Sequence, residues 1–173
     1  MSGRRTVRTR PRNGLAISDI LTAAIVSELC SPSDEVWLVS GWATDIVVLD
    51  NKDHRYDAVM GPAARSHLTL SEAFAQFTRN GTEVHVALRE NDHNFVFADK
   101  LRRACAHGLL GLYSSPDLHE KILVGSTWLL KGSMNFTWSG THRNEESVEF
   151  EVNSQQAASQ RLELRTRWIG GGS

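Results

Sequence analysis

Apolar and polar positions along the chain follow two different periods, and each period predicts a different kind of element. Four segments carry apolar residues at the spacing of a buried helix face: residues 17–29, 68–78, 93–107 and 154–168. Six others form short apolar runs or strict alternation, as β-strands do: residues 36–42, 83–88, 109–113, 119–124, 127–131 and 147–152. This order of elements predicts an α/β fold whose central sheet is flanked by helices on both faces.

Local signals set several of the boundaries. The first helix should start at Ser18 or Asp19 and end before Pro32. The predicted strands 119–124 and 127–131 should form a β-hairpin, because only the pair Gly125-Ser126 lies between them. Three segments are less regular: residues 43–50 would extend a strand or begin a short helix, residues 51–66 would form a long loop, and residues 132–140 would form a loop.

Composition narrows the class of protein. The 173 residues suffice for one domain, and 40% apolar with 23% charged residues is typical of a globular chain. The formal net charge is −1, so an anionic ligand would have to meet a local basic surface. Cys30 and Cys105 lie far apart and form no disulfide framework or zinc signature, so we expect buried free thiols.

The N-terminal segment is the most basic part of the chain. Residues 1–14 carry five arginines and no hydrophobic period, which predicts a flexible basic arm that either contacts nucleic-acid phosphates or is simply solvated. No apolar stretch follows as in a secretory leader, and none is long enough to span a bilayer, so we expect a cytoplasmic protein without a membrane partner. A single domain should cover residues 15–169, followed by a flexible tail at 170–173.

The densest group of chemically useful residues lies in residues 119–146, HEKILVGSTWLLKGSMNFTWSGTHRNEE. Because alternate residues of a strand share a face, His119 and Lys121 should point the same way. That pair suits a phosphate, since lysine neutralises its oxygens and histidine attacks phosphorus or exchanges a proton. Gly132 would let the backbone approach a ligand, and Ser133 and Asn135 would offer hydrogen bonds to phosphoryl oxygens.

A carboxylate follows this group. Glu146, or with less reason Glu145, could hold the second ring nitrogen of His119, which would fix its tautomer and raise its basicity. Trp128 and Trp138 flank the same stretch, and we expect core or interface positions for them more than base-stacking platforms.

H-x-K, followed after ten residues by G-S-x-N and then by a glutamate, resembles the phospholipase D superfamily, in particular its small bacterial endonuclease branch. The resemblance implies a phospholipase D/nuclease-like fold with a mixed central sheet, and metal-independent phosphodiester cleavage without a cofactor. It also implies roles: His119 is the nucleophile that forms a phosphohistidine, Lys121, Ser133 and Asn135 bind the phosphate, and Glu146 orients His119. The family's aspartate five positions after the lysine is replaced by Ser126, a position thought structural.

Family enzymes use two histidines at one centre, and this chain has a single H-x-K. The resemblance therefore implies a homodimer whose two copies of His119 meet at the two-fold axis, titrate as a coupled pair and give a bell-shaped pH profile. The leading hypothesis is a nuclease acting on nucleic acid, most simply DNA. The alternatives are a weakly active or non-catalytic nucleic-acid-binding subunit of a bacterial defence or DNA-modification system, and a phospholipase or phosphatidyl transferase, for which the sequence shows no lipid-facing patch.

Overall fold

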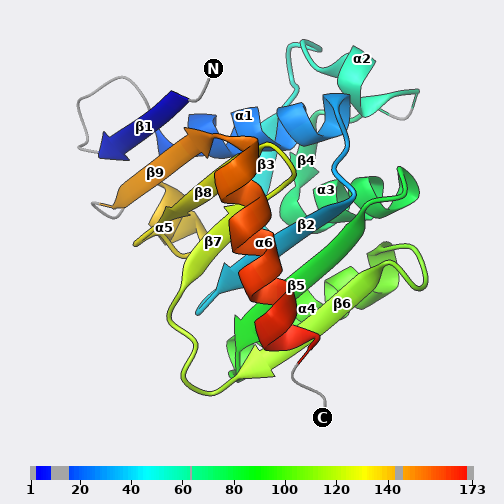
Figure 1. Ribbon diagram of the computed structural model, residues 1–173. Coiled ribbons are helices and arrows are strands. Elements are labelled where there is room, and N and C mark those ends of the chain that lie inside the picture. Colours follow the sequence, from blue (N-terminus) through cyan, green and yellow to red (C-terminus); the bar gives the residue numbers. More distant parts are fainter. Residues whose placement is uncertain (1–2, 9–15, 63, 143–145, 171–173) are drawn as a thin grey trace.

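The computed structural model describes residues 3–8, 16–62, 64–142 and 146–170 (Figure 1). Its main element is a seven-stranded mixed sheet in the order β1-β9-β8-β7-β2-β5-β6. The strands are β1 (Gly3–Arg8), β2 (Glu35–Ser40), β5 (Glu83–Arg89), β6 (Leu110–Ser115), β7 (Lys121–Val124), β8 (Trp128–Gly132) and β9 (Ser147–Val152). The strands β2, β5 and β6 run parallel, whereas β7, β8, β9 and β1 alternate in direction.

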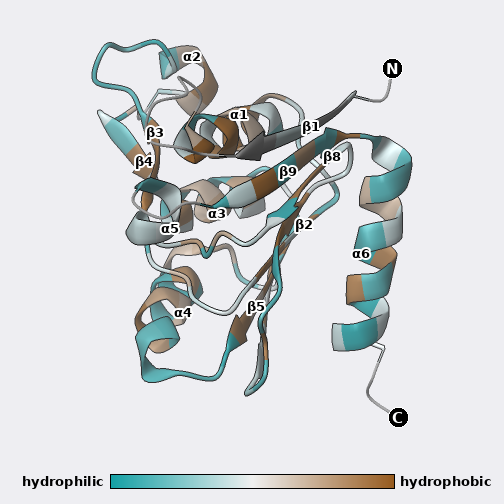
Figure 2. Cartoon of the chain, turned by 90° about the vertical axis from the view of Figure 1, so that its left-hand side faces the viewer, coloured by the Kyte–Doolittle hydropathy of each residue, from teal (hydrophilic) through white to brown (hydrophobic). Residues whose placement is uncertain are grey.

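Helices cover both faces of this sheet, as the periodicity predicts (Figure 2). The helices α1 (Ile17–Cys30), α3 (Leu70–Arg79) and α4 (Asp92–Ala104) lie on one face, and α6 (Ser154–Trp168) lies on the other. The larger apolar core joins the first face to its three helices, while a second cluster beneath α6 contains Ala157 and Leu164. Because β2 is covered by both layers, all six of its residues are buried, which explains the apolar run at residues 36–39.

Ion pairs hold α6 against the sheet, and a stack of rings within the sheet lies beneath the helix. The carboxylate of Glu35 accepts hydrogen bonds from Nε of Arg161 at 3.2 Å and from Nε of Arg165 at 2.7 Å. Beneath the helix, Trp37 stacks on His85 with ring centroids 4.3 Å apart, and the hydroxyl of Tyr113 lies 3.2 Å from Nδ1 of His85. A polar and aromatic layer therefore sits where a purely apolar helix contact would be usual.

Three irregular segments contain structure that local patterns did not predict. Residues 43–50 contain β3 (Val47–Asp50), which pairs with β4 (His67–Thr69) in a separate two-stranded sheet instead of extending β2. The expected long loop contains the short helix α2 (Asp57–Met60), and the expected loop at 132–140 runs into α5 (Trp138–His142). Each of these elements is short, so tertiary contacts decide it more than propensity does.

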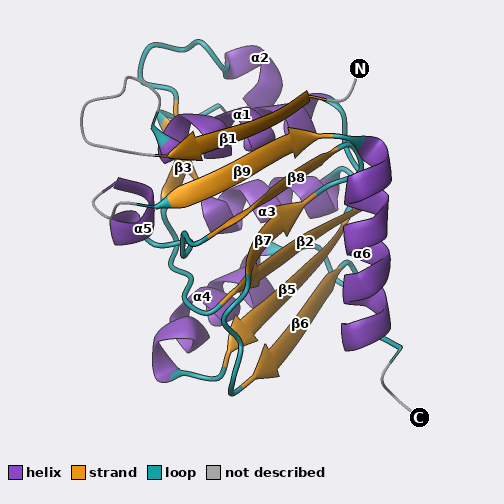
Figure 3. Ribbon diagram, turned by 60° about the vertical axis from the view of Figure 1, so that its left-hand side comes forward, coloured by secondary structure: helices purple, strands orange, loops and turns teal. Residues whose placement is uncertain are grey.

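The prediction of a flexible arm over residues 1–14 is corrected at its start. Residues 3–8 form β1, which pairs antiparallel with β9 from Gly3 opposite Val152 to Arg8 opposite Ser147 (Figure 3). An exposed strand edge offers unpaired backbone groups that a polar segment can satisfy without any apolar pattern of its own. The rest of the arm and the end of the tail, residues 9–15 and 171–173, lie outside the described residues.

Two smaller expectations also have outcomes. Both cysteines are free, but Cys30 is exposed at the end of α1 and Cys105 is only partly buried, so the prediction of buried thiols is wrong for Cys30. The helix α1 begins after Ala16 rather than at Ser18 or Asp19, and Asp19 instead accepts a hydrogen bond from the Ala16 N–H at 3.0 Å. Within the described residues, no helix has the length and apolar character needed to cross a bilayer.

Candidate active site

The ends of four strands bring the sequence-predicted residues to one edge of the main sheet. The first residue of β7, Lys121, lies opposite Ser40, the last residue of β2. The last residue of β8, Gly132, lies opposite Val148 at the start of β9. His119 therefore precedes β7, Ser133 and Asn135 follow β8, and Glu146 precedes β9, all at the same edge. In Figure 3 this edge carries the arrowheads of β2, β5 and β6.

His119 does not belong to the strand that was predicted to carry it. The strand β7 begins at Lys121, because its partner β2 ends at Ser40, so alternation along a strand cannot set the direction of both side chains. The His119 side chain is exposed, and the Nζ of Lys121 donates a 2.5 Å hydrogen bond to the backbone oxygen of His119. The two residues are thus coupled through the main chain.

Ser133 and Glu146 meet directly. The Ser133 hydroxyl donates a short hydrogen bond to the Glu146 carboxylate and accepts one from the Ser147 N–H at 3.1 Å. The Ser133 N–H in turn donates to the Ser147 oxygen at 3.0 Å. Among the described residues, no hydrogen bond joins Glu146 to the His119 ring, so the expected orienting contact stays a prediction. The alternative carboxylate, Glu145, lies outside the described residues.

Gly132 has a structural role that the sequence did not predict. A Cβ built at Gly132 would lie 2.1 Å from the backbone oxygen of Ser147, far inside contact distance. The missing side chain therefore lets β9 approach the end of β8 and brings Glu146 to Ser133, while the predicted approach of a ligand to this backbone stays a prediction.

Gly41, directly after β2, links the two halves of the motif. A Cβ at Gly41 would lie 3.1 Å from the backbone oxygen of Leu118 and 3.6 Å from Oδ1 of Asn135. The residue before His119 and the amide of Asn135 thus contact the same point of the backbone. Oδ1 of Asn135 is buried and has no hydrogen-bond partner among the described residues, which is unusual for a buried polar atom and typical of a functional site.

Asn94 holds this region together, and sequence reasoning missed it. Its side-chain amide donates to the backbone oxygens of Gly41 at 2.9 Å and Arg89 at 2.8 Å, while its oxygen accepts from the Ala43 N–H at 3.0 Å. The loop after β2, which contains Gly41, also pairs with the segment after Asn135. The Phe136 N–H donates to the oxygen of residue 42, and the N–H of residue 44 donates to the Phe136 oxygen. Asparagine is common at the start of a helix, so neither its residue type nor its position indicated this role.

Ser126, the departure from the family pattern, lies at the opposite end of β7 from Lys121. Its N–H donates to the Ser33 hydroxyl at 2.7 Å, and that hydroxyl donates to the buried carboxylate of Glu28 at 2.9 Å. Glu28 also accepts from Nε1 of Trp128 at 3.2 Å. Burial raises the pKa of Glu28, and the hydrogen bonds from Ser33 and Trp128 offset part of that rise. The Glu28 carboxylate, which belongs to α1, is therefore linked through the Ser33 hydroxyl to the turn in which Ser126 replaces the aspartate.

The surroundings of the site are polar with one aromatic surface. Trp128 is in the core, as expected, but Trp138 on α5 is 55% exposed and stacks on His142 with ring planes 10° apart. Across the part of the chain that the structure describes, no group of three or more His, Cys, Asp and Glu side chains is arranged to hold a metal ion.

A mixed sheet covered on both faces, with these residues at one edge, is the phospholipase D/nuclease-like fold. The chain resembles Nuc from Salmonella typhimurium, a phospholipase D family member, with a TM-score of 0.64 and 13% identity over 100% of this chain and 97% of that one. NucT from Helicobacter pylori gives a TM-score of 0.62 and 10% identity over 96% of this chain and 95% of that one. The comparisons confirm the fold that the sequence predicts.

A third similar structure is TrmBL2, an archaeal chromatin protein described as showing a novel mode of DNA binding. It gives a TM-score of 0.55 and 13% identity over 95% of this chain and 51% of that one. No protein-family model matches the sequence, and the curated proteins give no match.

Proposed function

We propose that this chain is a phosphodiesterase that cleaves nucleic acid, most simply DNA, by way of a phosphohistidine. The observation that supports the proposal is that His119, Lys121, Ser133, Asn135 and Glu146 all lie at or beside the same ends of three neighbouring strands, β7, β8 and β9. An imidazole, an ammonium, a hydroxyl and an amide are the groups that phosphoryl transfer needs for attack and charge stabilisation. The phospholipase D/nuclease-like fold supports the same reaction class.

In the proposed reaction the His119 imidazole attacks phosphorus and the bond to one ester oxygen breaks. The second histidine of the centre gives that oxygen its proton. Water then attacks the phosphohistidine, losing a proton to the second histidine, which frees His119 and leaves a phosphate monoester and an alcohol. Lys121 would offset the charge on the non-bridging oxygens, with Ser133 and Asn135 as hydrogen-bond donors. The lysine and the amides supply the electrostatic stabilisation, so no metal or cofactor is assigned.

The contact between Ser133 and Glu146 suggests how the site responds to substrate. The single hydroxyl proton of Ser133 is committed to Glu146 in this structure. A phosphoryl oxygen that accepts this proton would break the bond between Ser133 and Glu146, and Glu146 would then turn toward the ring of His119. Substrate binding would in this way complete the orientation of the nucleophile.

The second histidine would come from a second copy of the chain, because the sequence holds one H-x-K. The exposed site edge is compatible with a two-fold dimer that places the two His119 rings side by side. A solution mass near twice 19.2 kDa is expected. One ring must be neutral and the other protonated, so the rate should have a bell-shaped pH profile. A monomer that cleaves DNA would contradict the shared site.

The deciding experiment incubates the protein with plasmid and single-stranded DNA in excess EDTA. Cleavage that survives EDTA and disappears in His119→Ala supports the proposal. His107→Ala is the matched control, since His107 is exposed beyond the end of α4, away from the site, and should keep full activity. Release of headgroups from phospholipid vesicles would instead indicate a phospholipase or transferase. The cytoplasmic location is a separate prediction from the sequence.

A second candidate function is a non-catalytic nucleic-acid-binding subunit of a defence or DNA-modification system. The similarity to TrmBL2, a chromatin protein described as binding DNA, favours it. DNA binding by both the wild-type chain and His119→Ala, with cleavage by neither, would support this candidate and exclude the first.

A further inference from the structure

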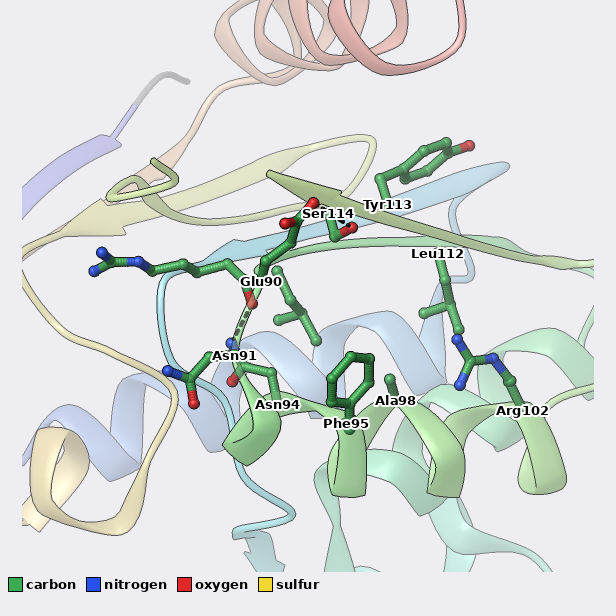
Figure 4. Close-up of a pocket in the computed structure, with 11 residues that line it drawn as sticks. Glu90, Asn91, Asn94, Phe95, Ala98, Arg102, Leu112, Tyr113 and Ser114 are labelled. Carbon is green, nitrogen blue, oxygen red and sulfur yellow. Dashed lines mark hydrogen bonds between the residues drawn. The ribbon is translucent and has the colours of Figure 1, made fainter. Parts of the chain in front are cut away.

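We propose that the cavity between α4 and the carboxyl ends of β5 and β6 binds a nucleobase of the same strand whose phosphate lies at Lys121. The proposal rests on the proposed function for its choice of substrate. It adds a subsite that binds a base of the strand at a distance from the cleaved bond. Figure 4 shows the cavity and the residues that line it.

The cavity has the size and walls of a site for one planar ring system. It measures about 110 Å³, below the range of pockets for drug-sized ligands, which starts at roughly 300 Å³. Its inner wall is apolar, from Leu88, Ala98 and Leu112. The ring of Phe95 projects from α4 toward the sheet (Figure 4) and is 61% exposed, an unusual state for a phenylalanine in a folded domain.

The polar part of the lining suits a base joined to a phosphate chain. Arg102 and Arg89, whose Nε donates to the Pro116 oxygen, supply two positive charges. The Asn91 amide nitrogen offers a donor to the edge of a base, while its oxygen accepts from the His93 N–H as the cap of α4. Bases stack on aromatic rings and arginine planes in proteins that hold single-stranded nucleic acid. The arginines argue for an anionic polymer, whereas an apolar peptide side chain or a lipid tail would make no use of them.

The position of the cavity relative to the site fits one continuous strand. Its wall includes Arg89, the last residue of β5, and β5 lies two places from β7 in the sheet. Two strand spacings put it roughly 10 Å from the line of Lys121, a span that neighbouring nucleotides cover. Asn94 also lines the cavity and bonds to both Arg89 and Gly41, so cavity and phosphate site are parts of one hydrogen-bonded unit.

The test compares binding of two probes by the His119→Ala protein, which should not cleave them. One is single-stranded oligothymidylate, and the other is an abasic tetrahydrofuran strand of equal length with the same phosphates. We expect the natural strand to bind about 5- to 160-fold tighter, the range for one stacked base. Adding Phe95→Ala to this protein should bring the ratio of the two affinities close to one without changing the affinity for the abasic strand. Phe95→Trp should keep the ratio.

The matched control is Val96→Ala, which removes an exposed apolar side chain from the next position of α4 outside the cavity. It should leave the ratio unchanged. Equal binding of the two strands, binding of neither, or a ratio that survives Phe95→Ala would overturn the subsite. Cleavage of bis(p-nitrophenyl) phosphate, which has no base, by the wild-type protein reports on the proposed function separately, so either idea can fail alone.

Discussion

Asn94 on α4 donates a 2.9 Å hydrogen bond to the backbone oxygen of Gly41, across the gap between the first helical layer and the end of β2. Asn94 is 3% exposed, and its other two bonds go to Arg89 and Ala43. The loop that supports the candidate active site is therefore held by a residue that belongs to neither the H-x-K nor the G-S-x-N part of the motif.

Replacing Asn94 with alanine should weaken both the fold and the reaction. The change leaves buried backbone groups of Gly41, Arg89 and Ala43 unpaired, which costs about 1–3 kcal/mol of unfolding free energy. Because the loop also supports Asn135, kcat should fall more than KM changes. Urea unfolding and steady-state kinetics measure the two effects. Gln155→Ala, on the exposed surface of α6, should alter neither, and an active, fully stable Asn94→Ala would contradict this role.

Adding one methyl group at Gly41 should separate the two halves of the site. The new Cβ would press on the Leu118 oxygen at 3.1 Å and touch the Asn135 amide oxygen. A displacement of this kind costs roughly tenfold or more in kcat, because phosphoryl transfer depends on alignment. Gly3→Ala is the control, since a Cβ at Gly3 meets nothing within 4 Å and should be neutral in kinetics and unfolding.

Restoring the family aspartate at position 126 should not raise activity. Ser126 lies at the far end of β7, and a carboxylate there would approach Glu28 through the Ser33 hydroxyl. We expect kcat within about twofold of wild type and a loss of about 1 kcal/mol in unfolding free energy. Parallel kinetics and urea unfolding of Ser126→Asp provide the measurement. A large gain in kcat would show that the serine limits the chemistry.

Glu28 should be required for stability and not for chemistry. In Glu28→Gln, one carboxylate oxygen is replaced by an NH2 group, which cannot accept a hydrogen bond. Depending on which way the amide turns, either the Ser33 N–H or the Trp128 Nε1–H loses its acceptor. The expected cost is about 1–3 kcal/mol. Thermal or urea unfolding measures it, with kcat of the folded variant unchanged. Glu163→Gln, on exposed α6, is the control, and equal stability of the two variants would refute the structural role.

His85 should make the fold sensitive to mild acid. Burial lowers the pKa of His85, an effect that Glu35 and Glu83 partly oppose. A lowered pKa means that the neutral ring is favoured in the folded state, so its contribution is complete above the ordinary histidine pKa and is lost as pH falls through the folded pKa. The unfolding free energy should thus drop in this window, and less so in His85→Phe. His107→Gln should behave as wild type.

The sequence determined the elements whose apolar period is long or continuous. The helix α6, the strands β5, β8 and β9 and the second part of the predicted strand 119–124 lie where their patterns predict, because burial of one face imposes a period on the sequence. It also supplied the candidate site residues, since H-x-K and G-S-x-N carry the functional groups that the proposed reaction needs. Short elements such as β3, α2 and α5 escaped prediction, because few residues carry too little pattern.

Only the tertiary structure decided how these pieces meet. The pairing of Lys121 with Ser40 starts β7 after His119, so the two motif side chains are related by main-chain contact and not by strand alternation. The approach of Ser147 to Gly132, the bridge from Asn94 to Gly41 and the carboxylate that Glu28 lends to the turn of Ser126 all join residues distant in the chain. Such contacts depend on the order and direction of strands in the sheet, which local periodicity does not encode.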